Sequence, residues 1–189
     1  TNGNFDLDVL LKGEEKPLLL PQTPRWFTPV GLPYGFTPDA QCPTWLQFLA
    51  RIMEGDQERI GFLQEWLGYN LALDTSLDKF VIFEGPGGNG KGVFLDVMTE
   101  ILGQDNVSNV PLEQFGDRFQ LMPTIGKLAN IVQEISDVAK PNEGTLKAFV
   151  SSTGRIGIDR KNKDPIAVKP TARLTLACNK RPHWSDRTD

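Results

Sequence analysis

The sequence predicts an α/β fold in which helices flank a parallel sheet and a phosphate-binding loop follows one of the strands. The first sign is a mostly apolar run at residues 80–84 that leads without a gap into a glycine-rich stretch. The second is a helical pattern directly after that stretch, and the third is a pair of later apolar strands at residues 128–133 and 173–178. Strands that alternate with helices are typical of a parallel sheet, which binds its ligand at the carboxyl ends of the strands.

The glycine-rich stretch fits the phosphate-binding pattern G-x-x-x-x-G-K-[ST] from Gly85 to Lys91. Glycines let the backbone wrap closely around a triphosphate, so that several N–H groups converge on it before a helix begins. Lys91 is expected to reach the β- and γ-phosphates, which predicts a nucleotide ligand. The residues expected to bind it are Gly85, Pro86, Gly87, Gly88, Asn89, Gly90, Lys91, Gly92 and Val93. The structural alternative is a glycine-rich turn that only joins a strand to a helix.

The last position of the pattern departs from the rule, because Gly92 stands where a Ser or Thr hydroxyl would bind Mg²⁺. The helix that the pattern requires after the loop is clear, and Gly103 is expected to end it. Its apolar residues recur at helical spacing and are Val93, Phe94, Val97, Met98, Ile101 and Leu102.

The composition is that of an ordinary globular protein of one or two domains, with 189 residues, 39% hydrophobic residues and a net charge of −4. No apolar run reaches the ~18 residues of a membrane span, and no charged-then-apolar leader indicates secretion. The two cysteines, Cys42 and Cys178, lie far apart and fit no zinc motif. We expect them to be reduced thiols in a cytoplasmic protein.

Three regions are expected along the chain. Residues 1–38 are rich in proline and should form an irregular arm, and residues 39–76 should form a small helical subdomain of two helices. In that subdomain, Asp39 and Asp56 are candidate N-caps, and Gly55 and Gly68 are expected to mark the helix ends. Residues 77–189 should form the core that carries the phosphate-binding loop.

Two polar residues are expected at the carboxyl edge of the sheet. Glu134 follows the strand at residues 128–133, where it would bind Mg²⁺, directly or through water, or polarise an attacking water. Asn179 follows the strand at residues 173–178, where a neutral amide would orient water against the γ-phosphate. The alternatives are an acid that simply faces solvent and an ordinary turn residue.

The segment from residue 155 to residue 169 reads as a β-hairpin with a cationic tip, because apolar residues alternate on both sides of a polar turn. Arg160, Lys161 and Lys163 lie at this tip and are candidates for contacts with a nucleic-acid backbone. Residues 155–187 hold nine Lys or Arg residues against three Asp residues. A solvated cationic surface is the alternative interpretation.

These motifs, taken in order, resemble superfamily 3 helicases, in the branch of phage and plasmid primase-helicases related to the poxvirus primase-helicase. GPGGNGKG is similar to the Walker A loop of that branch, GKLANIVQEI to its Walker B strand and LTLACNKRP to its sensor strand. TLKAFVSSTGRIGIDRKNKDP resembles its hairpin motif, and WLQFLARIMEGDQERIGFLQEWLGYNL the helical region before its ATPase core. The resemblance covers residues 25–189.

The resemblance implies an AAA+-type P-loop ATPase core with ATP and Mg²⁺, acting in DNA replication. Lys91 would bind phosphate, Glu134 would take the Walker B role with Mg²⁺, Asn179 would be the sensor, and Lys161 and Lys163 would contact DNA. The intact protein would form a hexameric ring on single-stranded DNA and unwind in the 3′-to-5′ direction, in the cytoplasm of a bacterial host and encoded by a phage, prophage or plasmid. Two other functions stay open: a nucleotide-dependent DNA-binding assembly module with little hydrolysis, and a small-molecule P-loop kinase.

The chain departs from the family pattern at three points. Gly92 replaces the usual Ser or Thr, and Arg155 stands where the hairpin motif normally carries an acid. The arginine finger of the family lies downstream of the sensor strand, where Arg181 and Arg187 are candidates by position alone. We therefore expect the core to be truncated at its C-terminal end.

Overall fold

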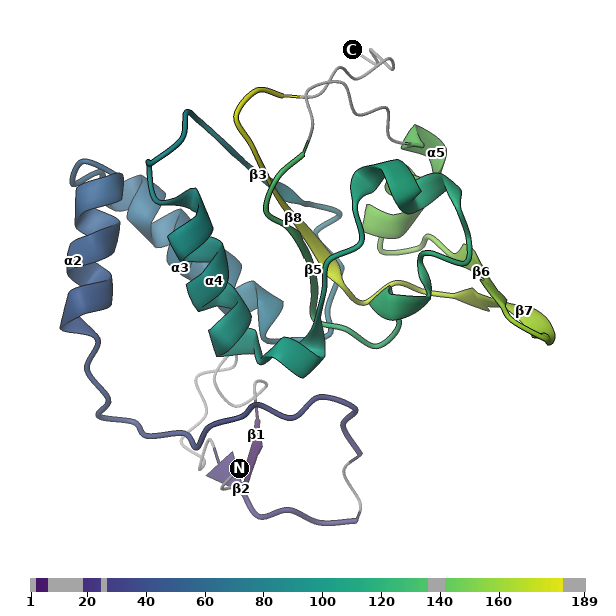
Figure 1. Cartoon of the computed structure of the whole chain (residues 1–189). Helices are drawn as coiled ribbons and strands as arrows, with labels where there is room; N and C mark the ends of the chain where they lie inside the picture. The colour runs from purple at the N-terminus through teal and green to yellow at the C-terminus, as the bar shows by residue number, and fades with distance from the viewer. Residues whose placement is uncertain (1–2, 7–18, 25–26, 136–141, 182–189) are drawn as a thin grey trace. The chain divides into compact units, whose positions relative to one another are not determined.

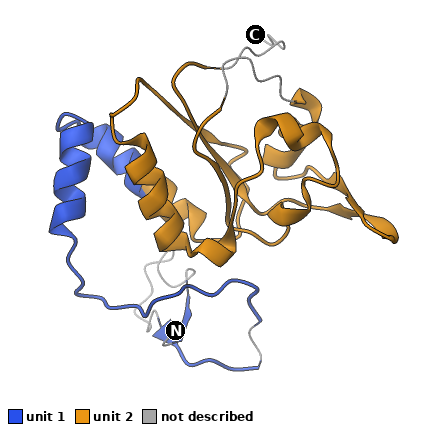
Figure 2. Cartoon of the chain, viewed as in Figure 1, with its two compact units in different colours: residues 1–64 blue, residues 65–189 orange. Residues whose placement is uncertain are grey.

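The computed structural model describes residues 3–6, 19–24, 27–135 and 142–181 of the chain (Figure 1). Two compact units are present, residues 1–64 and residues 65–189 (Figure 2). The boundary between them falls inside helix α3 (Gln57–Asn70). None of the helices in the described ranges is long and apolar enough to cross a membrane.

The N-terminal unit contains a two-stranded antiparallel sheet, β1 (Asn4–Phe5) and β2 (Leu19–Leu20). Helix α2 (Pro43–Ile52) follows. The expectation that Asp39 caps this helix is wrong, because the helix begins at Pro43 after Cys42, whose side chain makes no capping bond. Proline suits a first helical position without a side-chain cap, since its φ is already helical and it has no N–H to satisfy.

Helix α3 has the expected N-cap and an unexpected end. The carboxylate of Asp56 accepts a hydrogen bond from the Arg59 N–H at 3.1 Å, as predicted for an N-cap. The prediction that Gly68 ends the helix is wrong, since the helix continues to Asn70. Burial of Trp66 and Leu67 in this last turn offsets the ~1 kcal/mol that glycine costs inside a helix.

A four-stranded parallel sheet forms the centre of the C-terminal unit. Its strands lie in the order β3 (Val81–Glu84), β8 (Arg173–Cys178), β5 (Ala129–Val132) and β4 (Val107–Ser108). Every neighbouring pair is parallel, which confirms the mixed α/β fold with a parallel sheet. All six residues of β8 are buried, as expected for a central strand covered on both faces.

One face of the sheet packs against α4 (Lys91–Leu102), the predicted helix after the loop. The ring of Phe83 on β3 lies 5.0 Å from the ring of Phe94 on α4. Thr175 of β8 lies on this same face, because Phe83 pairs with Ala177 and residues two apart share a face. Its hydroxyl accepts a hydrogen bond from the indole N–H of Trp66 at 3.0 Å, so the last turn of α3 is fixed to the sheet by a buried polar contact.

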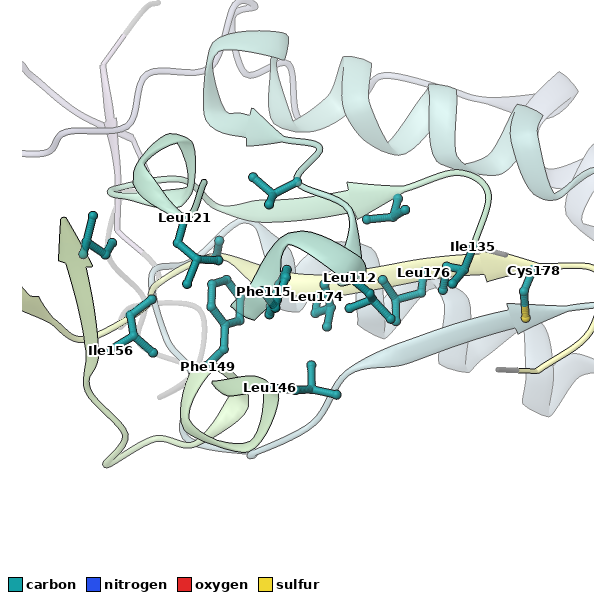
Figure 3. Close-up of a cluster of buried hydrophobic side chains, with 14 residues drawn as sticks. Leu112, Phe115, Leu121, Ile135, Leu146, Phe149, Ile156, Leu174, Leu176 and Cys178 are labelled. Atoms are coloured by element: carbon teal, nitrogen blue, oxygen red, sulfur yellow. The ribbon is translucent and has the colours of Figure 1, made fainter. Parts of the chain in front are cut away.

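The other face carries the main hydrophobic core, which Figure 3 shows in close-up. Side chains from η2 (Leu112–Gly116) and α5 (Glu143–Val150) pack there on alternate residues of β8. The short elements η1 (Gln104–Asn106) and η3 (Met122–Thr124) complete a connection for which the sequence predicted no element. The labelled members of this core are Leu112, Phe115, Leu121, Ile135, Leu146, Phe149, Ile156, Leu174, Leu176 and Cys178.

The predicted hairpin is confirmed as the antiparallel pair β6 (Ile156–Arg160) and β7 (Lys163–Val168). Ile156 and Ile158 anchor it, since both belong to the core of the C-terminal unit. Gly154 sets its entry: a Cβ there would lie 2.0 Å from the carbonyl oxygen of Ala148, so only glycine allows this close approach of α5 and the hairpin.

The bond between Trp66 and Thr175 gives a stability prediction. Trp66→Phe should lower the free energy of unfolding by about 2 kcal/mol, because it leaves a buried hydroxyl without its donor. Thr175→Val should lower the free energy of unfolding much less in the Trp66→Phe background than in the unsubstituted chain, since both polar partners are then gone. Urea unfolding of the two single variants and the double variant measures this. Strict additivity of the two substitutions would show that the bond contributes nothing.

Candidate functional site

The stretch from Gly85 to Gly92, called the glycine-rich loop below, joins the carboxyl end of β3 to the first residue of α4. The Gly85 N–H donates to the carbonyl of Cys178 at 3.3 Å, which fixes the start of the loop to the end of β8. Gly90 precedes α4 with a φ of +89°, a left-handed conformation that glycine adopts without strain. The first N–H groups of α4 therefore face the loop, as in helix N-termini that bind anions.

Lys91 lies on the inner side of the glycine-rich loop. Its ammonium group donates to the carbonyls of Gly85 and Pro86, the latter at 3.0 Å, and to the side-chain oxygen of Asn89 at 3.1 Å. These three acceptors match the three N–H donors of an ammonium group. The loop is thus curved around a positive charge, and an anion that enters the curve meets Lys91 and backbone N–H groups together.

The next two residues of α4 are open to solvent. A Cβ at Gly92 would meet no atom within 4 Å, so no other group fills the space that a Ser or Thr side chain would take. The side chain of Val93 is 52% exposed.

The strand order places Asn179 between the glycine-rich loop and Glu134. β8 lies between β3 and β5, and Asn179 is exposed directly after β8. Two strand spacings of ~4.8 Å separate the ends of β3 and β5 by roughly 10 Å. The glycine-rich loop, Asn179 and the segment of Glu134 therefore follow three neighbouring strands at the same carboxyl edge of the sheet.

Glu134 lies two residues past β5, whereas the sequence predicted that the strand reaches residue 133. The side-chain amide of Gln133, between the end of β5 and Glu134, donates to the carboxylate of Asp96 on α4 at 2.6 Å. On the other side, the Ile135 N–H donates to the carbonyl of Ala177 at 2.9 Å. Glu134 is therefore exposed at the sheet edge between two fixed neighbours.

Asp96 and Gln133 were not among the predicted site residues. The sequence did contain a signal, because Asp96 lies one helical turn after Gly92 and so on the same side of α4. Its carboxylate is thereby brought to the segment that holds Glu134. Among the described residues, no group of three or more His, Cys, Asp or Glu side chains is arranged to hold a metal ion.

Arg181 lies at the same edge and forms an ion pair with Glu84, the last residue of β3. Arg187, the other candidate, lies outside the described residues. Burial raises the pKa of the neighbouring Cys178 thiol above its usual value. The thiol is buried in the core of the C-terminal unit, as is typical of a structural cysteine.

The tip of the hairpin carries Lys161 and Lys163, both exposed, on either side of Asn162, whose φ is +57°. Arg160 is engaged within the hairpin, since Nε and Nη2 donate to the carbonyl of Asp164 at 3.1 and 2.8 Å. Arg160 thus stabilises the tip of the hairpin. Figure 1 shows the hairpin projecting away from the sheet, so its cations and the glycine-rich loop form two separate features.

The model of DUF5906, a family of unknown function, matches residues 83–189. The chain belongs to the DUF5906 family. The family region begins within β3 and contains the glycine-rich loop, Glu134, the hairpin and Asn179. A search of curated protein sequences finds no match.

Crystal forms of the apo NrS-1 C-terminal region share the fold of this DUF5906 member. One aligns with a TM-score of 0.60 at 20% identity, covering 82% of this chain and 40% of that chain. Another aligns with a TM-score of 0.56 at 19% identity, covering 90% of this chain and 39% of that chain. The chain therefore spans about two fifths of the NrS-1 region that it matches.

Two glycines of the loop give a matched test of its geometry. Gly90→Ala should lower the free energy of unfolding by about 1–2 kcal/mol, because alanine is strained in the left-handed region. Gly92→Ala should leave it unchanged or raise it by up to about 1 kcal/mol, since the position is helical and the space beside it is open. Urea unfolding followed by far-UV circular dichroism compares them. Equal effects would contradict the loop conformation described here.

Proposed function

We propose that this chain is the ATP-hydrolysing core of a DNA helicase of the superfamily 3 type, from a phage or plasmid replication protein. The observation that carries the proposal is the meeting of Lys91 within the glycine-rich loop, Asn179 and Glu134 at one edge of a parallel sheet. The ordered family motifs and the cationic hairpin support DNA as the second ligand. The fold shared with the NrS-1 C-terminal region agrees with such a core.

In this proposal the triphosphate lies in the curve of the glycine-rich loop. Backbone N–H groups of the loop and the start of α4 bind the phosphate oxygens, and Lys91 exchanges its loop acceptors for phosphate. Glu134 orients the attacking water, and the amide of Asn179 holds the γ-phosphate side of the site without changing charge with pH. Rate enhancement comes from positioning and charge stabilisation.

The donor set at this edge fits Mg²⁺. In nucleotide sites Mg²⁺ is held by one or two carboxylates together with phosphate oxygens and water. Two carboxylates are available here: Glu134 follows β5, and Asp96 lies in the second turn of α4, where it is bonded to Gln133. Bound there, Mg²⁺ would neutralise charge on the phosphates. The hydroxyl that Gly92 lacks is replaced in this proposal by water or by these carboxylates.

Single-stranded DNA and neighbouring copies of the chain complete the proposed machine. Lys161 and Lys163 are exposed at the hairpin tip and would contact the phosphate backbone without sequence preference. A hexameric ring would surround the strand, and neighbouring subunits would contribute to each ATP site. Since the chain spans only part of the NrS-1 region that it resembles, the ring belongs to the intact protein.

Gly92 favours one alternative, a nucleotide-dependent module that assembles on DNA and hydrolyses ATP slowly. Gly92 supplies no hydroxyl ligand for Mg²⁺, and no other group fills its place. Tight ATP binding with slow ATP hydrolysis would fit that module. Gly92→Ser discriminates the two, because restoring the hydroxyl should accelerate a module limited by metal binding. A small-molecule kinase, in contrast, would show no stimulation by single-stranded DNA.

Lys91 is the residue on which nucleotide binding should depend most. Lys91→Ala should abolish ATP hydrolysis and weaken ATP binding by at least about tenfold, through the loss of a charge-assisted contact to phosphate. Lys79→Ala is the matched control, because Lys79 is exposed at the opposite end of β3. Turnover and equilibrium binding are both measured. Unchanged turnover in Lys91→Ala would overturn the proposed function.

The hairpin makes a separate prediction about DNA. The double variant Lys161→Ala with Lys163→Ala should bind single-stranded oligonucleotides more weakly and reduce the salt slope of log K by about 1.4, since each single-strand contact contributes ~0.7. Lys79→Ala with Lys127→Ala removes the same charge before β3 and β5 and should change the slope little. Fluorescence anisotropy at several salt concentrations measures both. Equal slopes for the two double variants would rule out the hairpin as the DNA contact.

A further inference from the structure

Glu84 and Arg181 form an ion pair beside the glycine-rich loop. Glu84 is the last residue of β3 and directly precedes Gly85, and Arg181 lies two residues after Asn179. Nε of Arg181 donates to a carboxylate oxygen of Glu84. The pair therefore joins the segment after β8 to the entrance of the loop.

Arg181 and Lys91 approach the same end of β8 from two directions. Lys91 donates to the carbonyl of Gly85, and the Gly85 N–H donates to the carbonyl of Cys178. Arg181 reaches the residue before Gly85 through Glu84. The charges of Glu84, Lys91 and Arg181 all act on the pKa of the Cys178 thiol, in agreement with these contacts.

The exposure of the pair leaves the guanidinium accessible to an anion. The Arg181 side chain is 71% exposed and that of Glu84 is 38% exposed. Within the described residues, Glu84 is the hydrogen-bond acceptor for this guanidinium, and the bond uses Nε. The two Nη groups form the fork that suits phosphate oxygens.

The charge of Glu84 gives a second reason to expect a cation beside the loop. A carboxylate one residue before the loop would repel a bound triphosphate, and Coulomb repulsion at short range weakens binding unless a positive charge compensates it. Arg181 compensates this charge through its ion pair with Glu84. A guanidinium held by its own chain's β3 is placed for that chain's nucleotide rather than for a neighbour's.

We propose that Arg181 binds the phosphates of the nucleotide held by its own chain, as a second cation beside Lys91, and that Glu84 positions it. The inference rests on the proposed function, because it concerns the same nucleotide site. It differs from the sequence-based expectation, in which Arg181 is a candidate for the arginine finger of the family.

Nucleotide binding to single chains tests this assignment. The full chain, Arg181→Ala, Arg181→Lys and Arg181→Glu are titrated against a fluorescent N-methylanthraniloyl derivative of ATP with Mg²⁺, at concentrations where sedimentation velocity shows monomers. Arg181→Ala should bind about tenfold more weakly. The nucleotide affinity of Arg181→Lys should lie between that of Arg181→Ala and that of the unsubstituted chain. Arg181→Glu should bind the nucleotide most weakly because it adds a second carboxylate. Lys180→Ala, next to Arg181 and also exposed, is the matched control and should bind normally.

The outcomes separate this inference from the proposed function. If the unsubstituted chain binds no nucleotide, the proposed function fails and the inference fails with it. If the unsubstituted chain binds and Arg181→Ala binds equally well as a monomer, the proposed function stands and Arg181 has no role in its own chain's site. A loss that appears only at concentrations where the chains associate would assign Arg181 to the neighbouring subunit and overturn the inference. Far-UV circular dichroism confirms that each variant is folded.

Discussion

The parallel pairing of β8 between β3 and β5 is the constraint on which the candidate site depends. All six residues of β8 are buried, with the hydrophobic core on one face and α4 on the other, so the strand has one register that satisfies both faces. That register brings the glycine-rich loop, Asn179 and the segment of Glu134 to a single edge. A shift of β8 by one residue would turn Leu174 and Leu176 away from the core and separate all three features.

Side-chain contacts then set the details of this edge. Gln133 is bound to Asp96 on α4, and Arg181 is bound to Glu84 on β3, so both polar segments after the strands are fixed to the elements that carry the loop. Each contact is exposed and individually weak, which lets the groups exchange partners when an anion arrives. The buried framework gives the site its position, and the exposed contacts give it the freedom to respond to a ligand.

Much of the architecture could be predicted from local sequence pattern. The loop, α4, the hairpin and the two apolar strands have distinctive spacing and lie where the pattern predicted them, although β5 is one residue shorter at each end than predicted. The strand order, the pairing of Arg181 with Glu84 and the bond between Trp66 and Thr175 could not be predicted, because they join residues far apart in the chain. The errors at Asp39 and Gly68 have a local cause: proline at the first helical position and burial of the last turn of α3 outweighed the usual cap and end signals.

The most direct test of the central claim is a titration of the ¹⁵N-labelled chain with Mg²⁺ and a non-hydrolysable ATP analogue, followed by amide chemical shifts. If the phosphates lie at the edge organised by β8, the largest changes occur in residues 85–93, with further changes at Glu134 and Asn179. Shifts that are absent from residues 85–93, or that are confined to the hairpin tip or to residues 1–64, would contradict the claim.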